Sequence, residues 1–196
     1  MTFTKQSLQA KAPFALNTCL PATDRTGERP TVVAIIRGIG SEVLLVLPQK
    51  AAVHTRNSWM FPQGPIAQNM TPLQALDQLL RSECSLSVAD LEPGSAEALA
   101  VEFAHTPQGN KRYYFVFARL LSGRYRTLTA TAKEVTRGMF FAGNPLWVWD
   151  KMAEARAEKQ KIIARMLMLL VHKRLLTGPE WGLDQLRPLH EFVVSK

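Results

Sequence analysis

The sequence predicts an α/β (α+β) fold, an α/β/α sandwich in which a mixed β-sheet lies between helices. Three observations support this class. Short β-branched or aromatic runs bounded by turn residues predict strands, and two longer segments with apolar residues at helical spacing predict helices. Strands and helices alternate along the chain, which is typical of a layered domain. The 196 residues are enough for one such domain with its own core.

The first part of the chain predicts an irregular arm followed by a hairpin. Residues 1–29 are mixed in character and rich in turn residues, so no regular element is expected there. The β-branched run 31–36 and the apolar run 43–47 predict two strands, and the turn at 38–41 joins them. A basic polar loop over 48–60 follows the hairpin.

Helix start signals come together at Thr71. Thr71 suits the N-cap, Pro72 suits the first helical position, and Gln74 completes a capping box. Apolar residues then recur at helical spacing, so one face of the helix is expected to be buried. These residues are Leu73, Leu76 and Leu80. The helix is predicted to run from Pro72 to about Ser85.

The second half of the chain predicts three strands and a long helix. The segments 97–105 and 112–120 read as strands, and aromatic residues on both faces of the second suggest that both faces are covered. A short apolar strand is expected at 139–142. A helix is expected from about 151 to 176, where apolar residues form a stripe and the remaining positions are mostly basic. The Gly-Pro pair at 178–179 is predicted to end it.

These elements predict three parts in the chain. We expect an irregular N-terminal arm over 1–29, one sandwich domain over 30–177, and a C-terminal tail over 178–196 that packs back onto the domain. No apolar run reaches the roughly 18 residues that span a bilayer. The two cysteines, Cys19 and Cys84, form no disulfide or zinc framework. A cytoplasmic protein with reduced thiols and no membrane partner is therefore expected.

The charge of the chain bears on its partners. The net charge is +8 and the sequence pI is about 9.8. A basic balance favours anionic partners such as nucleotides, RNA or acidic protein surfaces. A basic surface that only contacts solvent explains the same number, so charge alone leaves both interpretations open.

One segment carries a specific pattern. Residues 59–66 read Trp-Met-Phe-Pro-Gln-Gly-Pro-Ile and come directly before the capped helix. Together with the hairpin that precedes it, this order resembles the Nudix hydrolases. It is most similar to the bacterial RNA pyrophosphohydrolases, which commonly carry Trp-x-Phe-Pro-Gln-Gly at this point. The resemblance spans roughly residues 31–176 and implies a Nudix-like sandwich.

The resemblance breaks at the chemical positions. The family signature is Gly, five residues, Glu, seven residues, Arg-Glu, an apolar residue, any residue, Glu-Glu, any residue, Gly and an apolar residue. In the order of its specified positions, this chain carries Gly64, Met70, Gln78, Leu79, Leu80, Ser82, Glu83, Ser85 and Leu86. The apolar positions and the first glycine are kept, whereas most of the acidic positions are lost.

The lost positions are those that would bind a metal. In active relatives, carboxylates at the positions of Leu79, Ser82 and Glu83 share one helical face and hold Mg²⁺, which bridges the diphosphate and activates water. Only Glu83 remains as a metal-ligand candidate. Glu134 resembles a distal Glu that some members add from a loop. Both are weak catalytic candidates, since an ordinary surface role fits each, and Mg²⁺ is expected only if residual activity exists.

Other residues are candidates for binding the ligand. The resemblance and the basic loops suggest six nucleotide- or phosphate-binding residues, which are Lys50, Arg56, Gln63, Gly64, Lys111 and Arg112. For the basic residues, a solvated loop is the competing interpretation. Trp59 and Phe61 are predicted either to stack against a base or to pack in the core.

The resemblance implies a degenerate Nudix-domain protein, deficient in hydrolysis, that binds a nucleotide, a nucleotide-sugar or a 5′-phosphorylated RNA end, or acts as a regulatory subunit. Two other functions stay open. One is a divergent metal-dependent pyrophosphohydrolase that acts on nucleoside diphosphate-linked substrates or RNA 5′ ends. The other is a protein-interaction module that uses the vacated cleft, where Met70 and Leu79 are apolar. Because Leu79 is apolar, we expect it to be buried by the protein's own arm, by its tail or by a partner.

Overall fold

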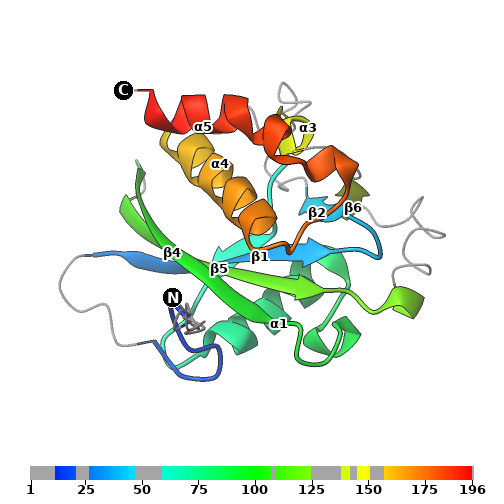
Figure 1. Ribbon diagram of the computed structural model, residues 1–196. Helices are drawn as coiled ribbons and strands as arrows, with labels where there is room; N and C mark the ends of the chain where they lie inside the picture. Colours follow the sequence, from blue (N-terminus) through cyan, green and yellow to red (C-terminus); the bar gives the residue numbers. More distant parts are fainter. Residues whose placement is uncertain are drawn as a thin grey trace, which may run out of the picture.

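A six-stranded mixed sheet forms the middle layer of the structure (Figure 1). The computed structural model describes residues 12–20, 27–46, 59–106, 109–124, 138–141, 145–150 and 157–195. The strands are β1 Arg29–Arg37, β2 Val43–Val46, β3 Gln63–Pro65, β4 Glu97–Thr106, β5 Gly109–Arg119 and β6 Gly138–Phe141. Their order is β4-β5-β1-β2-β6, and β3 pairs with β1. The central pair, β1 and β5, is parallel, and the other pairs are antiparallel.

Helices cover both faces of this sheet. The helices are α1 Pro72–Cys84, η1 Val88–Asp90, α3 Pro145–Asp150, α4 Ala157–His172, η2 Pro179–Trp181, η3 Leu183–Leu186 and α5 Arg187–Val194. Helix α1 lies on one face, and α3, α4 and α5 lie on the other (Figure 1). The predicted α/β/α sandwich is therefore confirmed. None of the helices in the described segments is long and apolar enough to cross a membrane.

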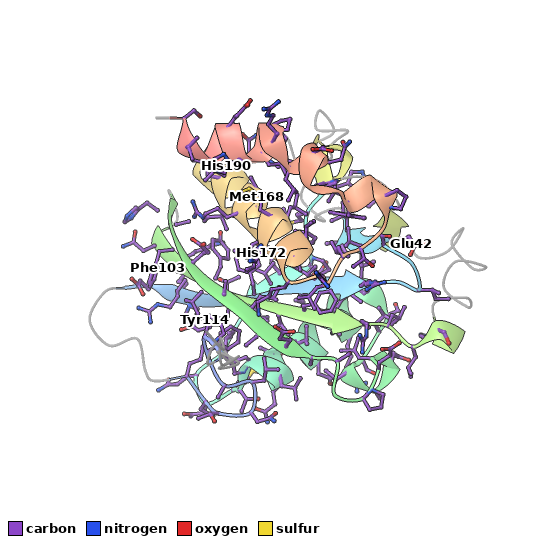
Figure 2. All side chains as sticks on the ribbon, viewed as in Figure 1. Glu42, Phe103, Tyr114, Met168, His172 and His190 are labelled. Atoms are coloured by element: carbon purple, nitrogen blue, oxygen red, sulfur yellow. The ribbon has the colours of Figure 1, made fainter. Side chains whose placement is uncertain are left out.

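The alternation of side chains along β5 divides the core in two. Tyr113, Phe115 and Phe117 join the cluster under α4, whereas Tyr114 and Val116 join the cluster over α1. Figure 2 shows side chains filling both layers. Because β1 and β5 are buried on both faces, they read as nearly continuous apolar runs, as expected for central parallel strands.

The segment before α1 fills the space between β1 and β2. The predicted hairpin is present, but its strands pair directly only at Arg37 and Val43. Farther along, the backbone of Pro62 accepts a hydrogen bond from Ala34 (2.8 Å) and Met60 exchanges two with Val46 (2.8 and 3.0 Å). Residues 60–65 thus satisfy backbone groups that the diverging hairpin leaves open. Strand β3, at 63–65, was not predicted from the sequence, and it follows from this role.

The N-terminus of α1 is closed by its own cap and by the arm. The predicted capping box is confirmed, since the Thr71 hydroxyl accepts from the Gln74 amide (3.1 Å) and the Gln74 side chain accepts from the Thr71 amide (2.9 Å). The Leu73 amide donates to the carbonyl of Leu16 in the arm (3.0 Å). Residues 12–20 of the arm contain no helix or strand. Phe14 packs edge-to-face against the ring of Tyr114 in the core.

The last helices complete the α4 side of the core. Trp181 and Leu189 are buried there, and Phe192 of α5 packs edge-to-face on Trp149 of α3 with ring centroids 4.9 Å apart. Helix α4 ends at His172, four residues before the predicted end, because Arg174 adopts a left-handed conformation (φ 59°) that turns the chain out of the helix. The predicted residues 151–156 of this helix lie outside the described residues.

Helix α1 ends in a strained residue. Ser85 occupies the glycine position of the family signature and adopts the left-handed conformation (φ 52°, ψ 32°), where its amide donates to the Leu80 carbonyl. Leu86 also donates to that carbonyl, at 3.1 Å. Glycine adopts this conformation without the steric cost that a Cβ atom adds. The helix therefore ends in a conformation that suits glycine, with a serine in that position.

We predict that Ser85→Gly raises the free energy of unfolding by about 0.5–1 kcal/mol, because it removes the steric cost of the left-handed conformation. Ser82→Gly is the matched control. Ser82 is exposed within α1, and glycine there should lower stability by about 0.5 kcal/mol. Urea denaturation of both variants measures the two changes. A loss of stability in Ser85→Gly would contradict the conformational argument.

Candidate functional site

The motif segment before α1 brings Gly64 against Leu79. A Cβ atom at Gly64 would lie 3.2 Å from Cδ1 of Leu79, so any larger residue at position 64 would push this side chain away. Leu79 is 5% exposed and belongs to the core cluster on the α1 side. The predicted burial of Leu79 is confirmed. An apolar side chain therefore packs against β3 at a position where the signature given above has a glutamate.

One carboxylate remains at the end of α1. Glu83 is half-buried one helical turn after Leu79, and it makes no hydrogen bond or ion pair with another described residue. The Ser82 hydroxyl donates to the Leu79 carbonyl (3.1 Å). The neighbouring Cys84 is buried, and burial, with a smaller effect of the Glu83 charge, raises the pKa of its thiol to about 12. Cys84 is thus a neutral core residue.

No metal-binding cluster forms around this carboxylate within the described part of the chain. Across those residues, no three His, Cys, Asp or Glu side chains lie together in a way that could hold a metal ion. The second candidate ligand, Glu134, lies outside the described residues. At the acidic positions of the signature, the described residues offer one carboxylate, that of Glu83, one helical turn from the buried Leu79.

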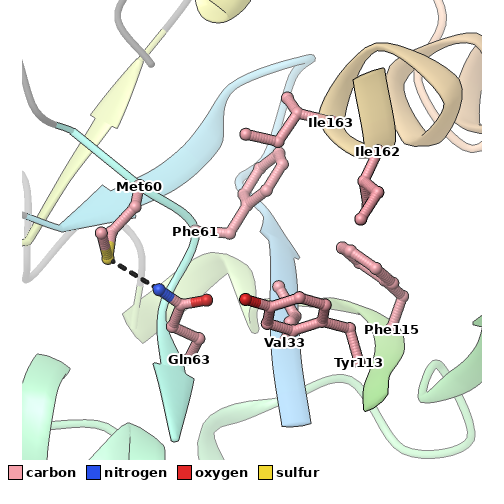
Figure 3. A pocket seen from close by; sticks show the side chains of 8 residues that line it. All are labelled: Val33, Met60, Phe61, Gln63, Tyr113, Phe115, Ile162 and Ile163. Atoms are coloured by element: carbon pink, nitrogen blue, oxygen red, sulfur yellow. Dashed lines mark hydrogen bonds between the residues drawn. The ribbon is translucent and has the colours of Figure 1, made fainter. Parts of the chain in front are cut away.

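A pocket lies on the other face of the sheet, beneath α4 (Figure 3). Together with the solvent space at its open mouth it amounts to about 310 Å³, but the interior that a water molecule can occupy is only about 20 Å³. The lining residues come from β1, the motif segment, β5 and α4, and they are Val33, Met60, Phe61, Gln63, Tyr113, Phe115, Ile162 and Ile163. As it stands the interior holds about one water molecule, so a planar ring enters only if flexible lining side chains such as Met60 move aside.

Two polar groups face each other across this apolar pocket. The Gln63 amide Nε2 donates to Sδ of Met60 (3.1 Å), because a thioether can only accept. The Gln63 carbonyl oxygen therefore points the other way, toward the hydroxyl of Tyr113 (Figure 3). Burial raises the pKa of Tyr113, so its hydroxyl stays protonated at neutral pH. The pocket presents an acceptor and a hydroxyl, and none of its lining residues is charged.

The motif Phe-Pro-Gln-Gly serves both faces of the sheet. In the antiparallel pairing of β3 with β1, Gln63 lies opposite Val33 and Gly64 lies opposite Val32. Successive strand residues point to opposite faces. Gln63 thus lines the pocket, while Gly64 meets α1. These two predicted ligand-binding residues therefore face opposite sides of the sheet.

The predicted basic residues also separate. Lys111 shares the face of Tyr113 and therefore the pocket side of the sheet. Arg112 points to the α1 side, where it forms an ion pair with Glu28 (2.5 Å) and stacks over the ring of Phe103 (4.8 Å). Alternation along β5 prevents both from reaching the pocket from the same face. Lys50 and Arg56 lie outside the described residues.

The sequence did not identify most of the pocket lining. Tyr113, Phe115, Ile162 and Ile163 read only as core residues, because apolar residues around a pocket and apolar residues in a core follow the same periodicity. Phe61 packs in the core, one of its two predicted roles, since it is 3% exposed within the core cluster. It also lines the pocket, and stacking against a base stays a prediction. Trp59 is half-buried against the α4 cluster.

We predict that Leu79→Glu lowers the free energy of unfolding by at least about 2 kcal/mol at neutral pH, because it forces a carboxylate into an apolar cluster. Burial should raise the pKa of the new carboxyl, so the loss is complete above that pKa and shrinks as the pH falls through it. Gln78→Glu adds the same charge at an exposed neighbouring position and should be nearly neutral. Urea denaturation at neutral and acidic pH measures both variants.

The double variant Leu79→Glu/Ser82→Glu tests the same site with a metal. If it were as stable as the wild type and its melting temperature rose with Mg²⁺, position 79 would be an open metal cleft, and the argument from packing would be wrong. We expect a lower melting temperature with or without Mg²⁺.

Comparison with solved structures identifies the fold. A mutT/nudix family protein from Listeria innocua matches with a TM-score of 0.55 and 15% identity, over 78% of this chain and 100% of its own. NrtR from Shewanella oneidensis matches with a TM-score of 0.53 and 18% identity, over 86% and 79%. The Ap4A hydrolase of C. elegans matches with a TM-score of 0.50 and 12% identity, over 73% and 98%.

Neither a protein-family profile nor a curated protein sequence matches the chain. At identities this low, likeness to solved structures establishes the fold and not the activity. The specific likeness to RNA pyrophosphohydrolases stays a prediction. The chain has the Nudix fold.

Proposed function

We propose that this protein is a Nudix-fold binding protein, deficient in hydrolysis, that holds the ring of a nucleotide or nucleotide-linked compound in the pocket beneath α4. The observation that carries this proposal is the pocket itself. It is apolar and aromatic, and it places the Gln63 carbonyl opposite the Tyr113 hydroxyl. A nucleobase is a flat, uncharged ring with hydrogen-bond donors and acceptors side by side on its edge, which suits these two groups.

The signature region supports binding rather than hydrolysis. Catalysis by this fold's signature depends on clustered carboxylates that hold Mg²⁺ against the diphosphate. Leu79 fills one of those positions by packing on Gly64, and Ser82 carries no charge at another. Among the signature positions on α1, only Glu83 remains as a candidate metal ligand, and it is a weak one. Removal of most of the local negative charge removes most of the electrostatic attraction for a divalent cation.

A nucleotide ligand also agrees with one structural neighbour, which is named as an Ap4A hydrolase. The choice among a free nucleotide, a nucleotide-sugar and a 5′-phosphorylated RNA end follows from what lies beyond the ring. The pocket has no room for more than a ring, so the remainder of the ligand must lie outside its mouth.

We predict that at least one of adenosine, guanosine, cytidine and uridine binds the protein and raises its melting temperature. Gln63→Leu should weaken that binding by about fivefold, because it removes one hydrogen bond and keeps the side-chain bulk. Gln78→Leu, at an exposed position of α1, is the matched control and should leave the affinity unchanged. Isothermal titration calorimetry measures the dissociation constants. Absence of binding by all four nucleosides would refute the proposal.

We predict no turnover above background on ADP, ADP-ribose, UDP-glucose or triphosphorylated RNA with Mg²⁺ or Mn²⁺. The physical reason is the single carboxylate beside a filled position, which cannot cluster metal ligands as the signature requires. Product release measured by chromatography tests this. Clear activity that disappears in Glu83→Gln would instead establish a divergent pyrophosphohydrolase.

A further inference from the structure

Two pairs of basic residues lie side by side on the central strands. The parallel register of β1 and β5 places Arg29 beside Lys111 at one end and Arg37 beside Arg119 at the other. All four positions share the odd-numbered alternation of Val33 and Tyr113, so they belong to the α4 side of the sheet. Like charges on directly neighbouring strand positions repel each other and destabilise a sheet.

The protein compensates this repulsion at one end. Arg119 forms an ion pair with Glu92 (2.6 Å), and Arg37 donates to the backbone carbonyls of Gly40 and Leu175 (2.5 and 2.9 Å). Both guanidinium groups are thus held by acceptors of the fold. The positive charges at this end of the strands, away from the pocket, are therefore matched by acceptors of the fold.

The other end has no such compensation within the part of the chain that the structure describes. There, the side chains of Arg29 and Lys111 make no hydrogen bond or ion pair with another described residue. The nearby carboxylate of Glu28 is taken by Arg112 on the opposite face of the sheet. Arg29 is exposed and Lys111 is half-buried, so solvent screens part of their repulsion and both charges stay available to an anion.

This uncompensated pair lies next to the pocket. Lys111 precedes Tyr113 by two residues on β5, and Arg29 precedes Val33 by four on β1. At roughly 3.3 Å per residue, these separations are about 7 and 13 Å along the strands. Both side chains are long enough to shorten those distances. A ligand whose ring fills the pocket can therefore extend its remaining groups toward them.

We propose that Arg29 and Lys111 form a phosphate subsite, which binds the mono- or diphosphate of the ligand whose ring occupies the pocket. This inference rests on the proposed function and names the part of the ligand that lies outside the mouth. Arginine offers a fork that matches two phosphate oxygens, and lysine adds a mobile point charge. The subsite binds the anion by direct contact and uses none of the signature positions on α1.

The test compares ADP, adenosine and inorganic pyrophosphate as probes by isothermal titration calorimetry. We expect ADP to bind more tightly than adenosine, and its affinity to fall as salt rises. In Arg29→Gln/Lys111→Gln, the affinity for ADP and pyrophosphate should fall at least tenfold, since hydrogen bonds to charged groups are worth about 1.5–3 kcal/mol each. Adenosine binding should stay unchanged. Arg81→Gln/Arg187→Gln removes two exposed charges elsewhere and is the matched control.

A second readout separates this role from a structural one. Removing two repelling charges should leave the melting temperature of the ligand-free protein unchanged or raise it, whereas loss of a structural ion pair would lower it. Equal binding of ADP and adenosine would overturn the subsite and leave the ring pocket standing. Binding of pyrophosphate without binding of any nucleoside would overturn the ring pocket and leave the phosphate subsite standing. Equal losses in both double variants would show that only net charge matters and would also overturn the subsite.

Discussion

Parallel pairing of β1 with β5 is the constraint on which the rest of the molecule depends. All nine residues of β1 have a partner in β5, and both strands are buried on both faces. Each odd-numbered residue must therefore serve the layer beneath α4, and each even-numbered residue must serve the layer over α1. This division assigns Tyr113 and Lys111 to the pocket side and sends Arg112 to the other. The chemistry available on each face follows from this register.

The two faces of the sheet differ in chemistry. On the α1 side, the capped helix and the left-handed turn at Ser85 frame an apolar cluster in which Leu79 packs on Gly64. On the α4 side, the pocket keeps polar groups that a sealed core would have to satisfy internally, namely those of Gln63 and Tyr113. One face is thus closed by apolar packing, and the other combines apolar packing with two polar groups.

The sequence predicted the fold well because its signals are local. The capping box at Thr71, the strand runs and the aromatic alternation of β5 each depend on residues a few positions apart, and the structure confirms them. The candidate site was harder, since it depends on register. A shift of one residue in the register of β5 would exchange the faces of Lys111 and Arg112, and that register is set by pairing with β1.

The basic helix is a second lesson of this kind. From the sequence, α4 is expected to be a helix with a basic remainder. In the structure, Arg165 pairs with Glu102 (2.7 Å) and Lys173 pairs with Glu97 (2.6 Å), so carboxylates of β4 neutralise part of it. These partners lie 63 and 76 residues away in the chain. No local pattern reveals them, which is why composition alone could not locate the free positive charge.

The short strand β3 has an evolutionary consequence. Its neighbouring residues Gln63 and Gly64 touch the pocket and α1 respectively, and only three residues make up the strand. A Cβ atom at position 64 would lie 3.2 Å from Cδ1 of Leu79, so β3 and α1 leave little room for a larger side chain at this contact. Because Gln63 is the next residue in the chain, substitutions at positions 64 and 79 are expected to show epistasis with substitutions that change the pocket. Mutation therefore cannot alter one face of β3 independently of the other.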